Sequence, residues 1–327
     1  MHKATNCRNM YGGPLAGMIA EYVFYKQTTG CEYFTEVKAF KAFDNFTKRF
    51  DFPEGVLPKQ VVLDWTKKRP SEKPLTQIKR VNAIRQLGEF MRMRGHDAYV
   101  PARIPWRGVD QYRPHIFSED EVSRILSLAD VYQSTIASPN LNRIVPIAFR
   151  ILYGCGLRCS ELINLKMQDV DLENCRLTIR ESKFHKDRIV PMAASLARFC
   201  ADYTSTVNKE CGSDDYFLRN PRGGRYDCQA PYHWFRELLF RAGIPHGGKG
   251  KGPRLHDLRH TFAVHCLKKW SISGRDMRVM LPVLSAYMGH CDLRGTQVYL
   301  HLTPDLFPHI ATTMSEYFYG EGHDETN

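Results

Sequence analysis

A tyrosine and a histidine near the end of the chain carry side chains suited to covalent chemistry. Tyr299 and His290 lie nine residues apart within residues 284–301, LSAYMGHCDLRGTQVYLH, between two short apolar runs. The turn signal His-Cys-Asp after Gly289 predicts two helices joined by a loop, with the tyrosine on the second helix. A phenolic oxygen placed there could be a nucleophile, but an arbitrary tyrosine more often fills a core with its hydroxyl hydrogen-bonded. The residues upstream decide between these interpretations.

The polar residues upstream of this stretch are ambiguous one at a time. Arg158 follows a Gly-Cys-Gly break, Lys183 lies in a predicted turn, and His256 and Arg259 share a helical face three residues apart. Each could be an ordinary surface or cluster residue, since Lys and Arg are exposed by default. Their order along the chain carries more weight, because it runs GCGLRCSEL, ESKFHKDRIVPM, LHDLRHTFA and then YMGHCDLRGTQVYLH.

In these four motifs the chain resembles the tyrosine recombinase/integrase family, the phage-integrase-like enzymes that break and rejoin DNA. The resemblance covers about residues 117–304, where several motifs coincide in order and spacing. For the N-terminal half it is architectural only, a small helical DNA-clamping domain ahead of the catalytic one. The family implies a C-shaped clamp on double-stranded DNA and a homo-tetramer on two DNA sites.

The resemblance assigns roles to individual residues. Arg158 matches the first catalytic arginine of the family, and Glu161 matches the acidic residue three positions later that supports it. Lys183 begins a K-x-x-K-x-R-x-V-P pattern and matches the catalytic lysine of a β-hairpin. His256 and Arg259 match the H-x-x-R pair of the family.

The family pattern continues at the end of this region. His290 follows Met-Gly and matches a position that the family fills with His or Trp. Tyr299 matches the nucleophile, and His301 matches the histidine that often follows it. Tyr287 is a rival nucleophile, but the T-x-x-Y-x-H frame that starts at Thr296 favours Tyr299.

Transesterification at a DNA phosphodiester explains these residue types. The transition state carries extra charge on the non-bridging oxygens, and the two motif arginines are planar, permanently charged donors for them, with His290 as a further donor. Attack by Tyr299 forms a phosphotyrosyl enzyme that conserves the bond energy for rejoining. In the family the hairpin lysine, here Lys183, protonates the departing 5′-oxygen, and His256 helps to deprotonate the tyrosine or to hold the phosphate. The cations take the place of a metal ion, so no metal and no cofactor is implied.

Three histidines leave a metal-site alternative. His256, His260 and His265 are close in sequence, and the first two are four residues apart. However, residue 257 is Asp, the H-E-x-x-H motif is absent, and no third ligand is suggested. A zinc hydrolase is therefore a distant alternative.

The charge of the chain favours a polyanionic partner. The net charge is +11, and residues 1–113 hold 20 basic against 11 acidic side chains. Double-stranded DNA is the first such partner and an acidic membrane the second, although no amphipathic basic helix suggests a membrane anchor. A basic but uncommitted surface explains the charge alone about equally well.

Four basic residues are candidates for DNA contacts. Lys79, Arg80 and Arg85 lie mostly off the buried face of a long amphipathic helix. Such a set is as readily a solvated helix face as a phosphate-binding one. Lys186, in the predicted hairpin turn, is the fourth candidate and a lesser rival to Lys183 as the catalytic lysine.

The pattern of apolar residues and breaks predicts two domains. A helical DNA-binding domain spans residues 1–105, a Pro-containing linker spans 106–116, and the catalytic domain spans 117–327. Ser118 and Glu121 have capping-box spacing at the start of the second domain. The fold class is mainly α with a small antiparallel β-sheet (α+β). The expected elements are helices over 14–28, 32–50, 75–94, 142–154, 194–240 in two pieces and 256–269, and strands over 176–181 and 188–192.

Composition and spacing bear on location and biological role. Ten scattered cysteines without a Cys-x-x-Cys motif, and a start without a signal-peptide core, predict reduced thiols in the cytoplasm. The long stretch between Arg259 and His290 is similar to recombinases of mobile elements, so integration, excision and transposition are the expected tasks. A DNA-binding protein without catalysis and a type IB topoisomerase-like enzyme remain alternatives. A short helix over 304–319 could pack in cis or dock on a neighbouring protomer.

Overall fold

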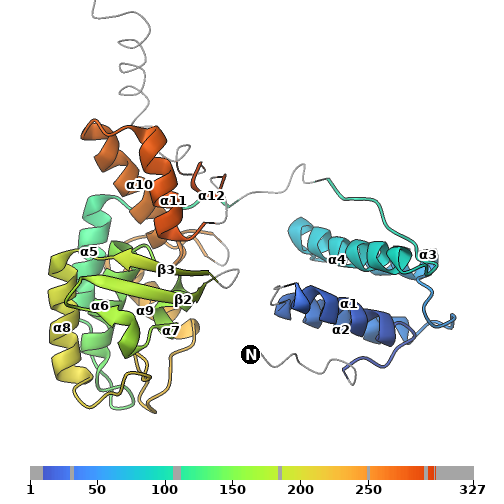
Figure 1. Cartoon of the computed structure of the whole chain (residues 1–327), viewed down its shortest axis with the longest axis horizontal. Helices are drawn as coiled ribbons and strands as arrows, with labels where there is room; N and C mark the ends of the chain where they lie inside the picture. Colours follow the sequence, from blue (N-terminus) through green and yellow to red (C-terminus); the bar gives the residue numbers. More distant parts are fainter. Residues whose placement is uncertain are drawn as a thin grey trace, which may run out of the picture. The chain divides into compact units, whose positions relative to one another are not determined.

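The chain divides into two compact units in a computed structural model, Met1–Tyr112 and Arg113–Asn327, and each is described by itself (Figure 1). The structure describes residues 10–29, 33–105, 112–182, 186–248, 251–290, 294–297 and 299. Lys183, His301 and the helix expected over 304–319 lie outside the described residues.

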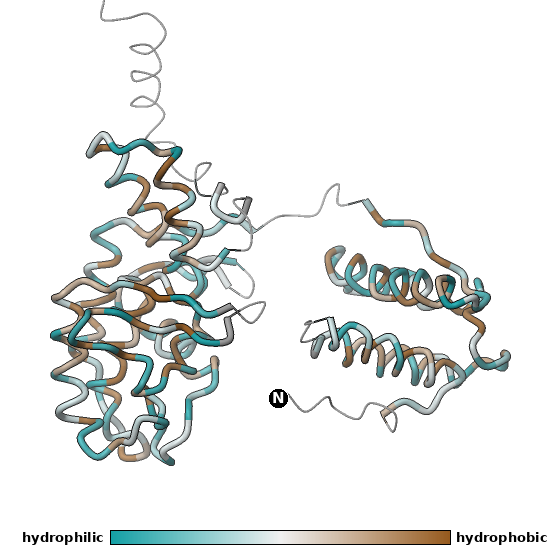
Figure 2. The backbone as a smooth tube through the Cα atoms, in the orientation of Figure 1, coloured by the Kyte–Doolittle hydropathy of each residue, from teal (hydrophilic) through white to brown (hydrophobic). Residues whose placement is uncertain are grey.

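The described part of the first unit is helical. It consists of α1 (Ala16–Thr28), α2 (Phe34–Thr47), α3 (Lys59–Thr66) and α4 (Pro74–Met93). Polar and apolar residues alternate along these helices (Figure 2), and the apolar faces meet in one core. Phe40 and Phe43 of α2 are fully buried in this core. The predicted stripe of α4 is buried as well, which confirms that helix and its register.

The second unit is mainly helical with one small sheet. Its capping box is confirmed, because the Ser118 hydroxyl accepts from the Glu121 backbone N–H at 3.1 Å and the Glu121 carboxylate accepts from the Ser118 N–H at 2.9 Å. Its elements, besides a 3-10 turn over Met167–Asp169, are α5 (Glu119–Asp130), α6 (Leu141–Gly154), α7 (Cys159–Asn164), β1 (Val170–Asp171), β2 (Arg176–Ser182), β3 (Lys186–Pro191), α8 (Ala194–Val207), α9 (Gln229–Arg241), α10 (Asp257–Ile272), α11 (Met277–Met288) and α12 (Arg294–Gln297).

The sheet is antiparallel in the order β1-β2-β3. The hairpin of β2 and β3 was predicted, and the structure adds a third strand, β1, in which Val170 pairs with Leu177. Arg188 pairs with Ile179 in β2. On β3, Arg188 and Val190 are covered whereas Ile189 is 57% exposed. The two-residue period of the strand therefore turns Arg188 toward the interior.

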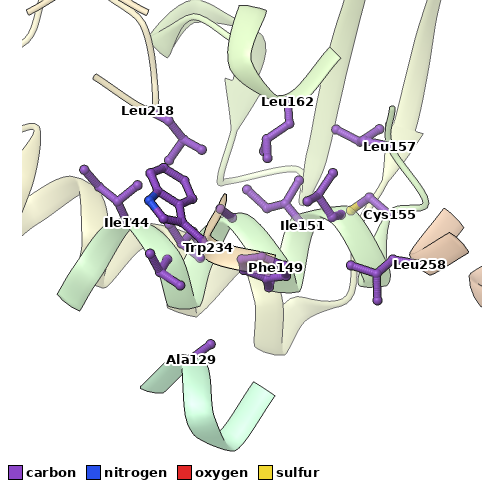
Figure 3. Packing of buried hydrophobic residues seen from close by; sticks show 14 of the residues in the cluster. Ala129, Ile144, Phe149, Ile151, Cys155, Leu157, Leu162, Leu218, Trp234 and Leu258 are labelled. Carbon is purple, nitrogen blue, oxygen red and sulfur yellow. The ribbon is translucent and has the colours of Figure 1, made fainter. Parts of the chain in front are cut away.

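Helix α6 lies at the centre of the core of this unit. Its buried residues come from nearly all sides of the helix, because α5, α8, α9 and α10 all pack on it. Figure 3 shows Ile144 and Phe149 of α6 close to Trp234 of α9, with Leu258 of α10 at the end of the cluster. The start of α10, which carries the H-x-x-R pair, is thus anchored to the core that also holds α7.

The longest helix that the structure describes is α4, with 20 residues. It carries charged residues along its exposed side. None of the described helices combines the length and the apolar character needed to cross a membrane.

Candidate active site

The chain turns sharply just before α7 and presents Arg158 there. Gly156 has φ +59°, and a Cβ at this position would collide with the ring of Phe262. Arg158 then occupies the N-cap of α7, and its backbone N–H donates to Glu161 Oε2 at 2.9 Å. Its Nη1 donates to Glu161 Oε1 at 2.6 Å. One carboxylate in the first turn therefore fixes both the backbone and the guanidinium of Arg158.

Glu161 also holds two other arginines. Arg188 donates to it through both terminal nitrogens, with each distance 2.9 Å, in a bidentate pair. Arg259 Nη1 lies 3.8 Å from Glu161 Oε2. Burial by itself would raise the pKa of Glu161, but the bonds from Arg188 and the nearby charges outweigh it and lower the pKa to about 2. Glu161 is thus an anion that gathers three cations.

The same three arginines cap the C-terminal end of α11. Arg188 Nε donates to the Tyr287 carbonyl at 2.9 Å, Arg259 Nη2 donates to the Met288 carbonyl, and Arg158 Nη2 donates to the Gly289 carbonyl at 3.3 Å. These carbonyls belong to the helix end, where acceptors lack partners and the helix dipole is negative. Segments from α7, β3 and α10 therefore converge on the residues directly before His290.

Arg259 is the most deeply placed of these cations. Its side chain is 1% exposed, and its Nη1 donates to the Gly156 carbonyl at 2.6 Å. Burial, followed by the charge of Arg158, lowers its pKa to about 10, so it remains a cation at pH 7. A lysine could not reproduce these two diverging bonds from one planar group.

Tyr299 lies against two histidines. Its ring centroid is 5.5 Å from that of His260 and 6.1 Å from that of His290. Nδ1 of His290 is 2.8 Å from the Thr296 hydroxyl. The Tyr299 side chain is 2% exposed and packs in a small cluster with residues of α10 and α11, including Leu267.

One expectation about Tyr299 is corrected. It was predicted to lie on the second helix, but α12 ends at Gln297, and the Tyr299 N–H closes a turn on the Thr296 carbonyl at 3.0 Å. Gly295, just before this turn, lies close to His290, because a Cβ added at Gly295 would be 3.3 Å from the His290 ring. The turn, and not a helical period, thus sets the position of Tyr299.

The histidines of the site are neutral at pH 7. Desolvation, followed by His260 and then by the charge of Arg259, lowers the pKa of His256 to about 4. Desolvation, followed by the charge of Arg259, likewise lowers the pKa of His290 to about 4. Each neutral ring has one nitrogen that donates and one that accepts, and in His290 Nδ1 is already paired with the Thr296 hydroxyl.

Comparison with known proteins identifies the protein class. The profile of the phage integrase family matches residues 115–305. The chain belongs to the phage integrase family. Tyrosine recombinase XerA of Thermococcus onnurineus is 31% identical over 223 residues, which cover 67% of this chain and 69% of XerA. The Sinorhizobium fredii protein y4rB, named as an integrase/recombinase, is 29% identical over 297 residues, 88% of this chain and 93% of y4rB. The protein is therefore a tyrosine recombinase, an enzyme of a class that cleaves and rejoins DNA.

Solved structures agree with this fold. The Tn1549 transposon integrase in complex with transposon right end DNA has a TM-score of 0.63 and 15% identity, covering 92% of this chain and 99% of that one. The XerH recombinase bound to difH in a post-cleavage complex has a TM-score of 0.61 and 18% identity, covering 87% and 79%. At these identities the likeness concerns the fold alone.

Tyr287, the alternative candidate for the nucleophile, has a structural role in the recombinase. Tyr287 donates its hydroxyl to the Pro191 carbonyl at 2.9 Å and stacks on Phe262 with ring centroids 5.4 Å apart. Its pKa is raised, first by burial. Lys183 lies outside the described residues, and Lys186 begins β3 with a side chain that is not described.

Arg188 is the residue of this site that sequence reasoning did not single out. It was noticed only as the arginine of the K-x-x-K-x-R-x-V-P pattern. Its position two residues before Val190 on a half-covered strand was the available signal, because an arginine on the covered face requires a buried anion as partner. Glu161 is that partner.

The basic residues predicted on α4 differ in what they contact. Arg80 is buried and donates to both oxygens of Glu72, at 3.0 and 2.7 Å, so it stabilises the first unit from within. Arg85 donates to the Pro101 carbonyl at 2.8 Å and to Glu89 at 2.7 Å. Lys79 is exposed. Arg80 is thus enclosed in an ion pair and not part of an exposed basic face, whereas DNA contacts by Lys79 and Arg85 stay a prediction.

The three histidines of the zinc alternative diverge. The rings of His256 and His260 meet edge to face with centroids 4.8 Å apart. His265 instead lies with Nδ1 2.8 Å from the hydroxyl of Tyr153. Among the residues that the structure describes, no group of three or more His, Cys, Asp or Glu side chains is placed to hold a metal ion.

The turn at Gly289 predicts a large effect of one methyl group. Gly289 has φ +65°, and an added Cβ would lie 3.0 Å from Arg188 Nη1. Gly289→Ala should therefore lower the free energy of unfolding by about 1 kcal/mol for the left-handed backbone and by roughly 1–3 kcal/mol more for the crowding of Arg188. Urea unfolding at pH 7 measures both.

Gly274→Ala is the control for this substitution. Gly274 follows α10 with φ +71°, and nothing lies within 4 Å of its added Cβ. Gly274→Ala should therefore lower the free energy of unfolding only by the backbone contribution of about 1 kcal/mol. Equal losses in the two variants would contradict the role of Gly289 in leaving room for Arg188.

Proposed function

We propose that this tyrosine recombinase binds double-stranded DNA and cleaves and rejoins its strands site-specifically through a covalent 3′-phosphotyrosine at Tyr299. The observation that carries the proposal is the convergence at His290. Arg158 and Arg259 bond the carbonyls directly before it, and the rings of His290 and Tyr299 stack. A nucleophile thus lies next to two fixed cations, as displacement at a phosphodiester requires.

The charges next to Tyr299 partly offset the cost of its burial. Burial raises the pKa of Tyr299 above its ordinary value, and the charges of Arg259 and Arg158 oppose this rise. The two arginines therefore favour the phenolate over the phenol, and they also favour the charge that develops on the phosphate. Arg158, with a side chain 23% exposed, is the most accessible of the three arginines around Glu161, so a phosphate can approach it from solvent.

The remaining residues take parts that follow from their chemistry. When the Thr296 hydroxyl donates to Nδ1 of His290, the ring proton lies on Nε2, where it can be donated to a non-bridging oxygen. His256 is exposed and lies on the same face of α10 as Arg259, so it can hold the phosphate. Lys183 is the proposed acid that protonates the departing 5′-oxygen. Glu161 positions the arginines and does not touch the substrate.

The proposed partner is DNA held by both units, with four protomers on two sites. The basic balance of residues 1–113 supports DNA binding by the helical first unit. The DNA complexes of XerH and of the Tn1549 integrase, which share this fold, support it further. Integration, excision or transposition of a mobile element is the task that we propose. Analytical ultracentrifugation of the protein with the DNA site identified by the trapping experiment described next tests the stoichiometry of four protomers on two sites.

Covalent trapping tests the reaction. The purified chain is incubated with lightly nicked genomic DNA from the cell that carries the gene, so that short cleaved strands diffuse away and the intermediate accumulates. Denaturation in detergent then leaves only covalent adducts on the DNA. Digestion and mass spectrometry should find the nucleotide on the peptide that contains Tyr299, and sequencing of the attached strand gives the site.

The outcomes of this experiment distinguish the proposed function from its alternatives. DNA that is bound but never linked indicates a binding protein without catalysis, and it overturns the proposed intermediate. Adducts spread over all sequences, with relaxation of supercoiled plasmid by single protomers, indicate a type IB topoisomerase-like enzyme. Adducts on a few related sequences support the site-specific recombinase.

A further inference from the structure

His260 lies between Tyr299 and the exposed His256. It sits in the first turn of α10, and its N–H donates to the His256 carbonyl at 3.3 Å. Its ring meets that of His256 edge to face, with centroids 4.8 Å apart, and tilts against the ring of Tyr299 at 5.5 Å. The ring of His260 therefore lies between the ring of Tyr299, which is 2% exposed, and the ring of His256, which reaches solvent.

Nδ1 of His260 has an unusual environment. This nitrogen is buried, and no group that the structure describes is hydrogen-bonded to it. Leaving a buried polar atom without a partner costs about 1–3 kcal/mol, so such an atom in a site calls for an explanation. A nitrogen held ready to take a proton during the reaction is one.

Burial, more than the neighbouring charges, favours the neutral form of His260 before the reaction. Burial lowers its pKa, the carboxylate of Asp257 opposes this, and the charge of Arg259 adds to it. The other groups that face it are His256, His290 and Tyr299, from the start of α10, the end of α11 and the turn after α12. A neutral imidazole is a proton acceptor, and the phosphate of bound DNA would stabilise the imidazolium that forms.

We propose that His260 accepts the phenolic proton of Tyr299 when the tyrosine attacks DNA, and that His256 exchanges this proton with solvent. The inference rests on the proposed function, because it requires Tyr299 to be the nucleophile. In the forward step the Tyr299 O–H bond breaks and its proton goes to His260. The phenolate oxygen bonds to phosphorus, and the bond from phosphorus to the 5′-oxygen breaks, so that this oxygen leaves and takes a proton from the acid. In rejoining, the 5′-hydroxyl attacks and the departing Tyr299 oxygen recovers a proton from His260.

His260→Asn separates proton transfer from packing. The amide fills part of the ring volume and keeps hydrogen-bonding capacity, but it does not accept a proton at neutral pH. Single-turnover adduct formation on the recovered site should slow by about 10²-fold at pH 7, the usual contribution of a general base. DNA affinity, measured by gel mobility shift, should stay within about twofold of that of the wild type.

The pH profile distinguishes the proposed role from a structural one. Without the acceptor, the rate should follow the phenolate fraction and rise by about tenfold per pH unit up to pH 9, so that the deficit shrinks. A defect of packing would lower the rate by the same factor at every pH. His260→Ala gives a second readout, because added imidazole should occupy the vacated space and restore the rate by at least about tenfold.

His265→Asn is the control. His265 lies on the same helix, and its ring is engaged with the hydroxyl of Tyr153 at 2.8 Å. This variant should keep the wild-type rate and pH profile. A His260→Asn rate equal to that of the wild type, or a deficit that is constant with pH and not rescued by imidazole, overturns the inference while leaving the proposed function intact. Absence of a Tyr299 adduct in the wild type overturns both.

Discussion

Replacing Tyr299 with phenylalanine should abolish covalent capture of DNA while leaving DNA binding unchanged. The substitution removes only the phenolic oxygen, and the ring still fills the cluster of α10 and α11 residues in which Tyr299 is buried. Loss of a nucleophile lowers the rate of the chemical step by roughly 10⁴-fold or more, because no neighbouring group can form the same bond. Adduct formation on the recovered site measures the loss, and gel mobility shift measures binding.

Tyr287→Phe is the control for this prediction. The Tyr287 hydroxyl donates to the Pro191 carbonyl, so its removal should reduce the free energy of unfolding by about 1 kcal/mol. Adduct formation should persist at a rate close to that of the wild type. A Tyr299→Phe protein that still links to DNA, together with a Tyr287→Phe protein that does not, would assign the nucleophile to Tyr287.

Local patterns allowed much of the fold to be predicted from the sequence. The stripe of α4 follows from an apolar residue every three or four positions, and the capping box at Ser118 follows from short-range hydrogen bonding. Such features depend on residues within one or two turns of each other. For the same reason the hairpin of β2 and β3 was predicted, whereas the two-residue strand β1 was too short to show a period.

Long-range contacts escaped prediction. Arg188 turns inward because the fold brings it to Glu161, 27 residues earlier. Arg80 turns inward toward Glu72, which lies eight residues earlier in the loop before α4. An arginine on an otherwise polar helix face carries no local sign of such a partner. The position of Tyr299 beyond α12 depends partly on a local turn on the Thr296 carbonyl and partly on long-range packing against α10. The motif order singled out Arg158 and Arg259 as candidates, but only the structure shows that both bond the carbonyls at the end of α11.

Glu161→Gln should be among the most destabilising single substitutions in the second unit. The Glu161 side chain is 6% exposed and bonds Arg158 and Arg188, with Arg259 3.8 Å away. The amide leaves three neighbouring guanidiniums without their shared anion, and two of them are buried. Removing one partner of a buried ion pair costs about 3–5 kcal/mol. Urea unfolding at pH 7 should show this loss, and adduct formation should fall because the arginines repel each other away from their positions.

The pH dependence of this loss identifies Glu161 as its source. Folding lowers the pKa of Glu161 from its ordinary value of 4.5 to about 2. A carboxyl group with a lowered pKa contributes stability that is complete above its unfolded-state pKa and is lost as the pH falls through the folded-state one. The free-energy difference between wild type and Glu161→Gln should thus be constant from pH 7 to about pH 5, and shrink by about 3 kcal/mol between pH 4.5 and 2.

Glu173→Gln controls for the general loss of a negative charge from this unit. Glu173 is exposed in the turn between β1 and β2, so its replacement should change the free energy of unfolding by less than about 0.5 kcal/mol at any pH. Other carboxyl groups titrate in the same range, but they do so in both proteins and cancel in the difference. The free-energy difference between wild type and Glu161→Gln could instead stay constant down to pH 2. In that case the packing of the Glu161 side chain, and not its charge, would hold the arginines in position.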